Sequence, residues 1–193
     1  MNQKNSLELD SCFLDTNDPI ELFKTWMNKA KETEPNDPNA LSLATTDING
    51  LPSVRIVLLK DFNENGFVFY TNLNSQKSLS LKKNPKAEMC FHWKSLLRQV
   101  RINGTVSEVL EKEANDYYDT RSYDSRIGAW ASKQSEVLNS RKELIDSINK
   151  YKEKYNNEKN VPRPNHWSGW RLLPKEIEFW LNVENRIHER LKY

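Results

Sequence analysis

Three strand-like apolar segments follow one another between residues 40 and 72, and two short turn signals separate them. The segments are ALSLATT (40–46), PSVRIVLLKDF (52–62) and FVFYTN (67–72), and the signals are DING and NENG. Turns this short join antiparallel strands, because a parallel pair needs a crossover connection of about a dozen residues or more. The run therefore predicts an antiparallel meander rather than an alternation of strands and helices.

Four further segments extend the predicted sheet. Residues 87–93, 98–109, 169–182 and 186–193 read as strands. Gly104, inside the second of them, is a candidate for a bulge or a corner. Together, the predicted strands indicate a mainly β protein of the α+β class, with a curved or closed antiparallel sheet and helices packed outside it.

The helix signals are clearest near the N-terminus. Asp18 is a good N-cap, Pro19 suits the first turn, and Glu21 completes a capping box. Ser75 is the expected cap of a second, shorter helix. Helices are predicted at residues 18–32, 75–85, 111–121 and 140–155.

The chain has 193 residues, the length of one ordinary domain. Residues 1–17 are polar and predict a flexible N-terminal segment, and residues 18–193 predict a single domain. Within that domain, residues 122–136 read as compact but less regular, and residues 156–167 read as a linker.

Composition excludes several classes of function. The net charge of +2 argues against nucleic acid as a partner, since proteins that track phosphates carry a strong basic excess. No apolar run approaches the about 18 residues that span a membrane, and the N-terminus has no secretory signal. Cys12 and Cys90 have no metal-ligand spacing and favour a reducing, cytoplasmic location. The sequence contains no G-x-G-x-x-G, P-loop or G-x-S-x-G motif, and its histidines predict no metal site.

The segment 52–62 poses a question about charge. Both of its faces are apolar, which is typical of a buried strand, yet it carries Arg55 and Lys60. A buried cation without a partner costs several kcal/mol, so each of the two predicts an anion nearby.

The pentapeptide RIHER is a second basic feature. In a strand, Arg186, His188 and Arg190 share one face, and three such groups repel unless an anion lies against them. A solvated edge strand with nearby glutamates explains the same residues. The pentapeptide alone leaves both interpretations open.

Other polar residues could bind a phosphate or a heterocycle, but none of them requires such a ligand. Lys77 beside a helix start is a modest anion site or a plain surface lysine. Tyr117 and Arg121 lie four residues apart on one helix face, followed by Ser125, and could grip a phosphorylated ring or simply pack. Trp180 is as compatible with the core as with stacking on a cofactor.

Taken in order, these segments resemble one family. The stretches RIVLLK, FYTN, SQK, LLRQV, SRIGAWASKQS, EIEFW and RIHERLKY are similar to those of the pyridoxamine (pyridoxine) 5′-phosphate oxidase family, from about Asp18 to Tyr193. The resemblance implies an FMN-binding split barrel that works as a homodimer with FMN at the interface. It also implies a contact of Lys60 with the substrate phosphate.

The resemblance also assigns site residues. The residues implied to contact FMN are Arg55, Ile56, Val57, Leu58, Leu59, Lys60, Tyr70, Thr71, Gln76, Lys77, Gln99, Gln134, Ser135, Trp180 and Arg190. Those implied to bind the substrate are Lys60, Tyr117, Arg121, Ser125, Arg186, Ile187 and His188, and the implied catalytic residues are Arg186, His188 and Asp37.

The implied reaction is a two-electron oxidation in vitamin B6 metabolism. A hydride leaves C4′ of pyridoxine or pyridoxamine 5′-phosphate for N5 of FMN, and pyridoxal 5′-phosphate results. Dioxygen reoxidises the flavin and gives hydrogen peroxide. The cofactor carries the chemistry, so the protein supplies stacking and orientation, which explains the absence of an obvious nucleophile or triad.

Three departures from the family pattern stand out. Gln76–Lys77 replaces the usual basic pair, the N-terminal Arg and Tyr that often cover the substrate have no clear match, and the family usually continues beyond Tyr193 to a further strand. We therefore expect the domain to lack that C-terminal strand. Two alternatives remain: a split-barrel flavin-binding protein or flavin reductase without this oxidase activity, and, more weakly, an RNA-binding sheet using FVFY.

Overall fold

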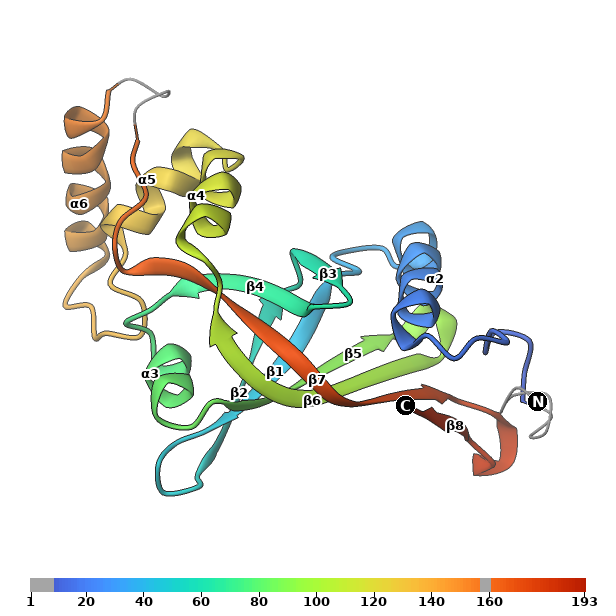
Figure 1. Cartoon of the computed structure of the whole chain (residues 1–193). Coiled ribbons are helices and arrows are strands. Elements are labelled where there is room, and N and C mark those ends of the chain that lie inside the picture. Colours follow the sequence, from blue (N-terminus) through green and yellow to red (C-terminus); the bar gives the residue numbers. More distant parts are fainter. Residues whose placement is uncertain (1–8, 157–160) are drawn as a thin grey trace.

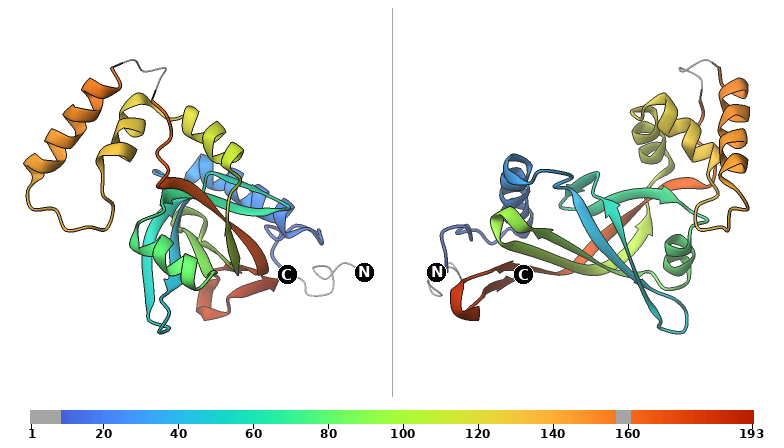
Figure 2. Two further views of the ribbon diagram at one scale, coloured as in Figure 1. Left: turned by 60° about the vertical axis from the view of Figure 1, so that its left-hand side comes forward. Right: turned by 180° about the vertical axis from the view of Figure 1, so that it is seen from behind.

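The computed structural model describes residues 9–156 and 161–193. Their strands form one antiparallel sheet in the order β2-β1-β5-β6-β7-β4-β3, with β8 paired to β7. The sheet curls into the half barrel seen in Figures 1 and 2, which confirms the predicted fold class. The strands are β1 (Ala40–Thr46), β2 (Pro52–Leu58), β3 (Asp61–Asn63), β4 (Gly66–Asn72), β5 (Lys86–Trp93), β6 (Arg98–Glu108), β7 (Trp167–Leu181) and β8 (Glu189–Lys192).

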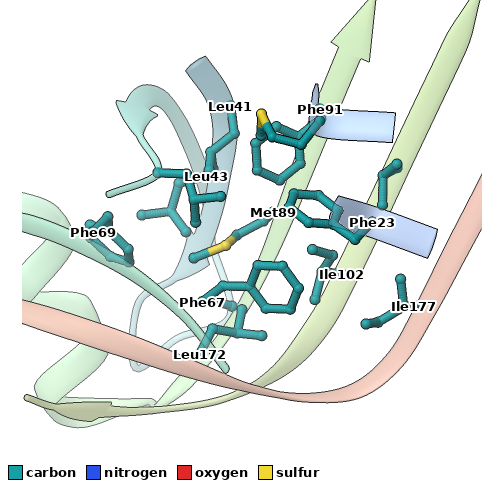
Figure 3. Close-up of a cluster of buried hydrophobic side chains, with 14 of the residues drawn as sticks. Phe23, Leu41, Leu43, Phe67, Phe69, Met89, Phe91, Ile102, Leu172 and Ile177 are labelled. Carbon is teal, nitrogen blue, oxygen red and sulfur yellow. The ribbon is translucent and has the colours of Figure 1, made fainter. Parts of the chain in front are cut away.

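The concave side of the sheet holds an aromatic core. Phe23 from the first helix inserts between strands and contacts Phe67, Phe91 and Phe62 at ring-centroid distances of 5.0, 5.2 and 4.8 Å. Figure 3 shows the rings of Phe23, Phe67 and Phe91 packed with Leu, Ile and Met side chains from β1, β5, β6 and β7. Burying a side chain of this size stabilises the fold by about 1.5–3 kcal/mol, so Phe23 anchors this helix to the sheet.

The helices gather at two ends of the sheet. In Figure 1, α2 covers one end, while α4, α5 and α6 cluster beyond the end of β4. Residues 123–131 form α5, so the expectation of a less regular segment there was wrong; Ser122 caps the helix by accepting from the Ser125 N–H. The helices are α2 (Pro19–Thr33), α3 (Gln76–Lys83), α4 (Glu111–Asp119), α5 (Tyr123–Ala131) and α6 (Arg141–Lys154). No helix among the described residues has the length and apolarity needed to cross a membrane.

The start of α2 differs from the predicted capping box. Asp18 caps the helix, and its carboxylate accepts the Ile20 N–H at 2.8 Å. The Glu21 carboxylate instead accepts the Thr16 hydroxyl at 2.6 Å, and Thr16 Oγ1 accepts the Asp18 N–H at 3.1 Å. The threonine hydroxyl therefore stands between the two groups that a capping box would join.

Part of the segment predicted to be flexible packs against the domain. The ring of Phe13 is fully buried, 5.3 Å from the ring of Trp26. The Trp26 indole N–H donates to the Cys12 carbonyl at 2.8 Å. Residues 9–17 thus close one end of the core, and residues 1–8 lie outside the described residues.

The segment 52–62 is neither one strand nor buried. β2 ends at Leu58 and β3 begins at Asp61. β2 is the edge strand of the sheet, and Val54 and Ile56 are 63% and 65% exposed. An apolar edge strand left open in one copy of a chain is a template for association.

The pentapeptide RIHER is also not a strand throughout. Residues Glu184–Arg186 form a 3₁₀ turn in which Asn185 and Arg186 have positive φ angles of 58° and 61°. β8 begins only at Glu189, so Arg186, His188 and Arg190 do not share a strand face. Two consecutive left-handed residues rotate the chain out of the alternation that the prediction assumed.

Gly104 forms the predicted bulge. The β6–β7 register shifts between Asn103 and Gly104. A Cβ atom at Gly104 would lie 2.0 Å from the Leu173 carbonyl oxygen, so only glycine lets the two strands approach this closely.

Candidate active site

Most residues that the resemblance assigns to FMN line one cavity, here called the β2 cavity, of about 550 Å³. β2 forms one wall, and α3 and the loop between α5 and α6 close the other side (Figure 1). The assigned residues that line it are Arg55, Ile56, Val57, Leu58, Lys60, Tyr70, Thr71, Gln76, Lys77, Gln134 and Ser135. Ser53 and Val54 also line it. Ser53 shares a strand face with Arg55, so the sequence pattern could have identified it, but the sequence interpretation missed it.

Three cations without a carboxylate partner line the β2 cavity, and two of them, Lys77 and Arg55, are at least partly buried. Lys77 is only 6% exposed, and its Nζ donates to Thr71 Oγ1 at 3.1 Å and Ser75 Oγ at 3.2 Å. Burial and the neighbouring Arg55 lower the pKa of Lys77 to about 8. None of the ion pairs between described residues includes either side chain. The pair is arranged to receive an anion.

Arg55 is held in place by neutral groups. Its guanidinium donates to Thr45 Oγ1 at 2.8 Å, the Leu43 carbonyl at 3.1 Å and Ser53 Oγ at 2.7 Å. Burial lowers its pKa. These contacts fix the guanidinium, but none of them is anionic, so the anion that the sequence predicts near Arg55 is not supplied by these partners.

Ser75 stands at the N-cap position of α3 but does not cap the helix with its side chain. Its hydroxyl donates to the Asn72 carbonyl at 2.7 Å and lies 3.2 Å from Lys77 Nζ. The predicted side-chain cap was therefore wrong, and the hydroxyl instead helps to fix Lys77.

A second cavity, here called the α5 cavity, of about 360 Å³ adjoins the first and shares Tyr70, Thr71 and Gln134 with it. Arg121 and Ser125 line it. The shared wall places the residues implied to bind the substrate phosphate next to the β2 cavity.

Arg121 is the dominant charge of the α5 cavity. Its guanidinium lies 4.7 Å from the ring centroid of Trp167, and its Nη1 is buried without a hydrogen-bond partner. Burial lowers its pKa. An unsatisfied buried guanidinium N–H is costly, which predicts an acceptor outside the protein. Trp167, which stacks under Arg121, was not recognised from the sequence and carries no distinctive signal there.

Tyr117 stands beside the shared wall. Its ring stacks on that of Tyr70 with centroids 4.0 Å apart, and both rings are nearly parallel to Trp167. Burial raises the pKa of Tyr70 to about 12, so its hydroxyl stays protonated. The stack makes the wall between the cavities rigid.

A separate group of assigned residues, here called the outer row, comprises Gln99, Trp180 and Arg190. Cross-strand pairing places Gln99 opposite Trp180 and Trp180 opposite Arg190. Each of the three has one buried core residue next to it in its strand, namely Val100, Phe179 or Leu191, so the alternation of side chains turns the outer row away from the core. None of the three lines the β2 or the α5 cavity. One copy of the chain therefore carries the assigned flavin residues as two separate groups.

Arg186, Ile187 and His188 lie next to the outer row and not at the cavities. The His188 ring lies 4.7 Å from that of Trp180, and its Nδ1 accepts the Val183 N–H at 3.3 Å. Ile187 is 73% exposed.

Two assigned residues stand apart from these groups. Leu59 is 5% exposed and belongs to the core, so its side chain does not line the β2 cavity. Asp37 is exposed, has a φ of 40° and lines neither cavity.

No cluster of three or more metal-ligating side chains occurs among residues 9–156 and 161–193. A larger cavity of about 700 Å³ at the Gly104 bulge contains no assigned residue.

Comparison with known proteins identifies the family. A family model described as pyridoxamine 5′-phosphate oxidase matches residues 27–155, and one described as the pyridoxine 5′-phosphate oxidase C-terminal dimerisation region matches residues 167–193. A pyridoxine/pyridoxamine 5′-phosphate oxidase of Pelagibacter ubique is 70% identical over 193 residues, covering 100% of this chain and 93% of the relative. One of Allorhizobium ampelinum is 54% identical over 181 residues, covering 94% and 87%.

Solved structures agree with this assignment. PhzG from Burkholderia lata, in complex with tetrahydrophenazine-1-carboxylic acid, superimposes with a TM-score of 0.86 at 30% identity, covering 92% of this chain and 87% of PhzG. An FMN-binding protein of Nostoc punctiforme has the same fold, with a TM-score of 0.68 at 14% identity, covering 92% and 98%. The chain thus belongs to the pyridoxamine 5′-phosphate oxidase family.

Proposed function

We propose that the chain oxidises pyridoxine 5′-phosphate and pyridoxamine 5′-phosphate to pyridoxal 5′-phosphate, with FMN as cofactor and dioxygen reduced to hydrogen peroxide. The observation that carries this proposal is the pair of adjoining cavities: one holds the buried Lys77, the other holds Arg121 with its buried Nη1, and neither side chain has a carboxylate partner among the described residues. One cavity suits the phosphate of a flavin and the other that of a substrate, and relatives 70% and 54% identical are named pyridoxine/pyridoxamine 5′-phosphate oxidases.

The residues of the β2 cavity fit FMN. Lys77 and Arg55 supply fixed positive charge for its phosphate, and Thr71, Gln134 and Ser135 supply hydroxyl and amide groups. When bound, FMN accepts the hydride from the substrate and returns the electrons to dioxygen. The protein's own part is to hold the ring and substrate in register and to exclude water.

The residues of the α5 cavity fit the substrate phosphate. Arg121 offers a buried N–H without a partner, and Ser125 lies on the same wall. Tyr117 is already stacked on the wall shared by the two cavities. Arg121 and Ser125 would hold the substrate phosphate in the α5 cavity, and the shared wall would bring the substrate ring to a flavin held in the β2 cavity.

The outer row completes the site from a second copy of the chain. The chain's match to a dimerisation region over residues 167–193 supports this, since that range contains Trp180 and Arg190. Exposed Val54 and Ile56 on β2 support it too, because they offer an apolar surface beside the β2 cavity. FMN would then lie at the interface of a homodimer.

His188 would present a hydrogen-bond donor. Because its Nδ1 accepts the Val183 N–H, the neutral ring carries its proton on Nε2. Together with Arg186, it would orient the pyridine ring of the substrate.

The direct test of function is simple. Purified protein should be yellow and should form hydrogen peroxide with pyridoxine 5′-phosphate in a stoichiometric ratio to pyridoxal 5′-phosphate. Bound flavin without peroxide or aldehyde would favour a flavin-binding protein or flavin reductase instead.

A complementation experiment tests the composite site. We expect a mixture of Lys77→Ala and Trp180→Ala dimers, after subunit exchange, to recover about a quarter of the wild-type FMN sites. Half of the exchanged dimers are mixed, and each mixed dimer has one site with both halves intact. FMN content and sedimentation are the measurements. A site built within one chain would recover nothing, because every chain carries a defect.

The lowered pKa of Lys77 predicts a pH dependence of FMN binding. In the apoprotein this pKa is about 8, and a bound phosphate raises it by stabilising the ammonium. Above pH 8, binding must therefore take up a proton, and affinity should fall by up to about tenfold per pH unit. Flavin titration of the apoprotein from pH 7 to 10 measures this slope. In Lys77→Met, the slope attributed to this residue should vanish; an unchanged slope would place the titrating group elsewhere.

Gln76 predicts a gain in affinity. A charge-assisted hydrogen bond contributes about 1.5–3 kcal/mol and a neutral one about 0.5–1.5 kcal/mol. Gln76→Arg should therefore tighten FMN about tenfold at low salt, and less at high salt. Leu79→Arg is the matched control, because it adds the same charge to α3 at a residue outside the β2 cavity. An unchanged dissociation constant for Gln76→Arg at low salt would show that residue 76 does not meet the phosphate.

A further inference from the structure

His92 stands beside the outer row and shares its face. Pairing of β5 with β6 places His92 directly opposite Gln99, as Gln99 is opposite Trp180 and Trp180 opposite Arg190. Its neighbours Phe91 and Trp93 are buried in the core, so the exposed imidazole points the other way. Side chains directly opposite on adjacent strands have Cβ atoms about 5 Å apart, so His92 continues the row by one strand.

The next row along the same face shows what an internally satisfied set looks like. Two residues along from Gln99 and Trp180, Arg101 lies opposite Glu178 and pairs with it at 3.5 Å; Arg101 also pairs at 2.6 Å with Glu88, four residues from His92 on β5. By contrast, the side chains of His92, Gln99 and Arg190 make no hydrogen bond or ion pair within the described part of the chain. The first row therefore has donors and acceptors that no other described residue of the chain satisfies.

We propose that His92 is a further flavin-contacting residue, which hydrogen-bonds the polar edge of the flavin ring held in the β2 cavity of a second copy. The inference rests on the proposed function, which brings the outer row to that flavin. A planar ring system with carbonyl and N–H groups along one edge suits these four side chains. The Gln99 amide and the His92 imidazole can hydrogen-bond the edge, and the Trp180 indole can stack on the ring. The Arg190 guanidinium lies beside the indole. Neighbouring strands are about 4.8 Å apart, so the four span about 14 Å, enough for a fused tricyclic ring.

The other two histidines do not compete for this role. His166 Nε2 lies 2.9 Å from the Ala129 carbonyl, and His188 Nδ1 accepts a backbone N–H. His92 has no such internal task, so its removal should leave the fold intact.

The test is flavin titration of the apoprotein, read by fluorescence quenching and by the visible absorption spectrum of the bound flavin. We expect His92→Ala to weaken FMN binding about three- to tenfold and to shift the visible band, since one neutral hydrogen bond is lost. Lys86→Ala is the matched control, because Lys86 lies on the same strand, exposed, and six residues away from His92. His92→Gln, which keeps a donor and an acceptor, should recover part of the affinity.

The outcomes separate this inference from the proposed function. If Trp180→Ala weakens FMN but His92→Ala matches the Lys86→Ala control in affinity and spectrum, the role of His92 is wrong and the proposed function stands. If neither Trp180→Ala nor Lys77→Ala affects FMN, the proposed site itself is wrong. Sedimentation of each variant must show the same oligomer as the wild type, and a His92→Ala effect that follows loss of that oligomer would also overturn the inference.

Discussion

Replacing Arg121 with alanine should raise the KM for pyridoxine 5′-phosphate about a hundredfold, while FMN binds as tightly as before. A charge-assisted pair of hydrogen bonds to phosphate is worth about 3 kcal/mol, or two decades in binding. The guanidinium lines the α5 cavity with an unsatisfied Nη1, and it does not line the β2 cavity, which holds Lys77. The loss should therefore fall on the substrate and spare the flavin. Steady-state kinetics and flavin titration measure the two effects separately.

Two controls sharpen this result. Pyridoxine, which has no phosphate, should be oxidised equally poorly by the wild type and Arg121→Ala, since the deleted contact is absent in both. Arg121→Lys should recover only part of the affinity, because an ammonium lacks the planar fork that also stacks on Trp167. A fall in FMN content in step with activity would show that Arg121 serves the flavin phosphate instead.

The two hairpins were predictable because turns act locally, whereas the predicted three-stranded meander was wrong: among the described strands, β2 pairs only with β1, and β4 lies between β7 and β3 at the other side of the sheet. DING and NENG each join neighbouring strands in the structure, and Gly104 forms the bulge that its position in a strand suggested. These outcomes depend on short-range sterics that a single sequence carries. The buried strand predicted for residues 52–62 failed for a different reason: apolar residues on both faces indicate that a surface is covered, but not whether the same chain covers it.

The site was less predictable than the fold because no single residue of the site is a specific signal in the sequence. Lys77 and Arg55 are separated by more than twenty residues, and only folding shows that both lack a carboxylate. Likewise, no pattern in the sequence indicated that Asn185 and Arg186 adopt left-handed conformations, so RIHER was predicted as a strand. Asp37, carried over from the family, lines neither cavity, and its catalytic role stays a prediction.

Removing the side chain of Arg186 or His188 should cut turnover about a hundredfold while leaving FMN content almost unchanged. About 2.7 kcal/mol of lost transition-state stabilisation corresponds to that factor. Both residues sit in the segment after Trp180, and we propose that they orient the substrate ring rather than bind the flavin. The measurements are kcat, KM and flavin stoichiometry for each variant.

The choice of variants decides whether the effect is chemical or merely structural. Arg186 has a φ of 61°, which glycine adopts without strain, so Arg186→Gly removes the guanidinium and keeps the backbone; Asn185→Gly, at a φ of 58°, is its matched control and should keep full activity. For His188, asparagine can still accept the Val183 N–H through Oδ1 but lacks the Nε2 donor. If His188→Asn is as slow as His188→Ala, the donor acts on the substrate. If it restores turnover, the imidazole only shapes the loop, and the substrate contact proposed for His188 is wrong.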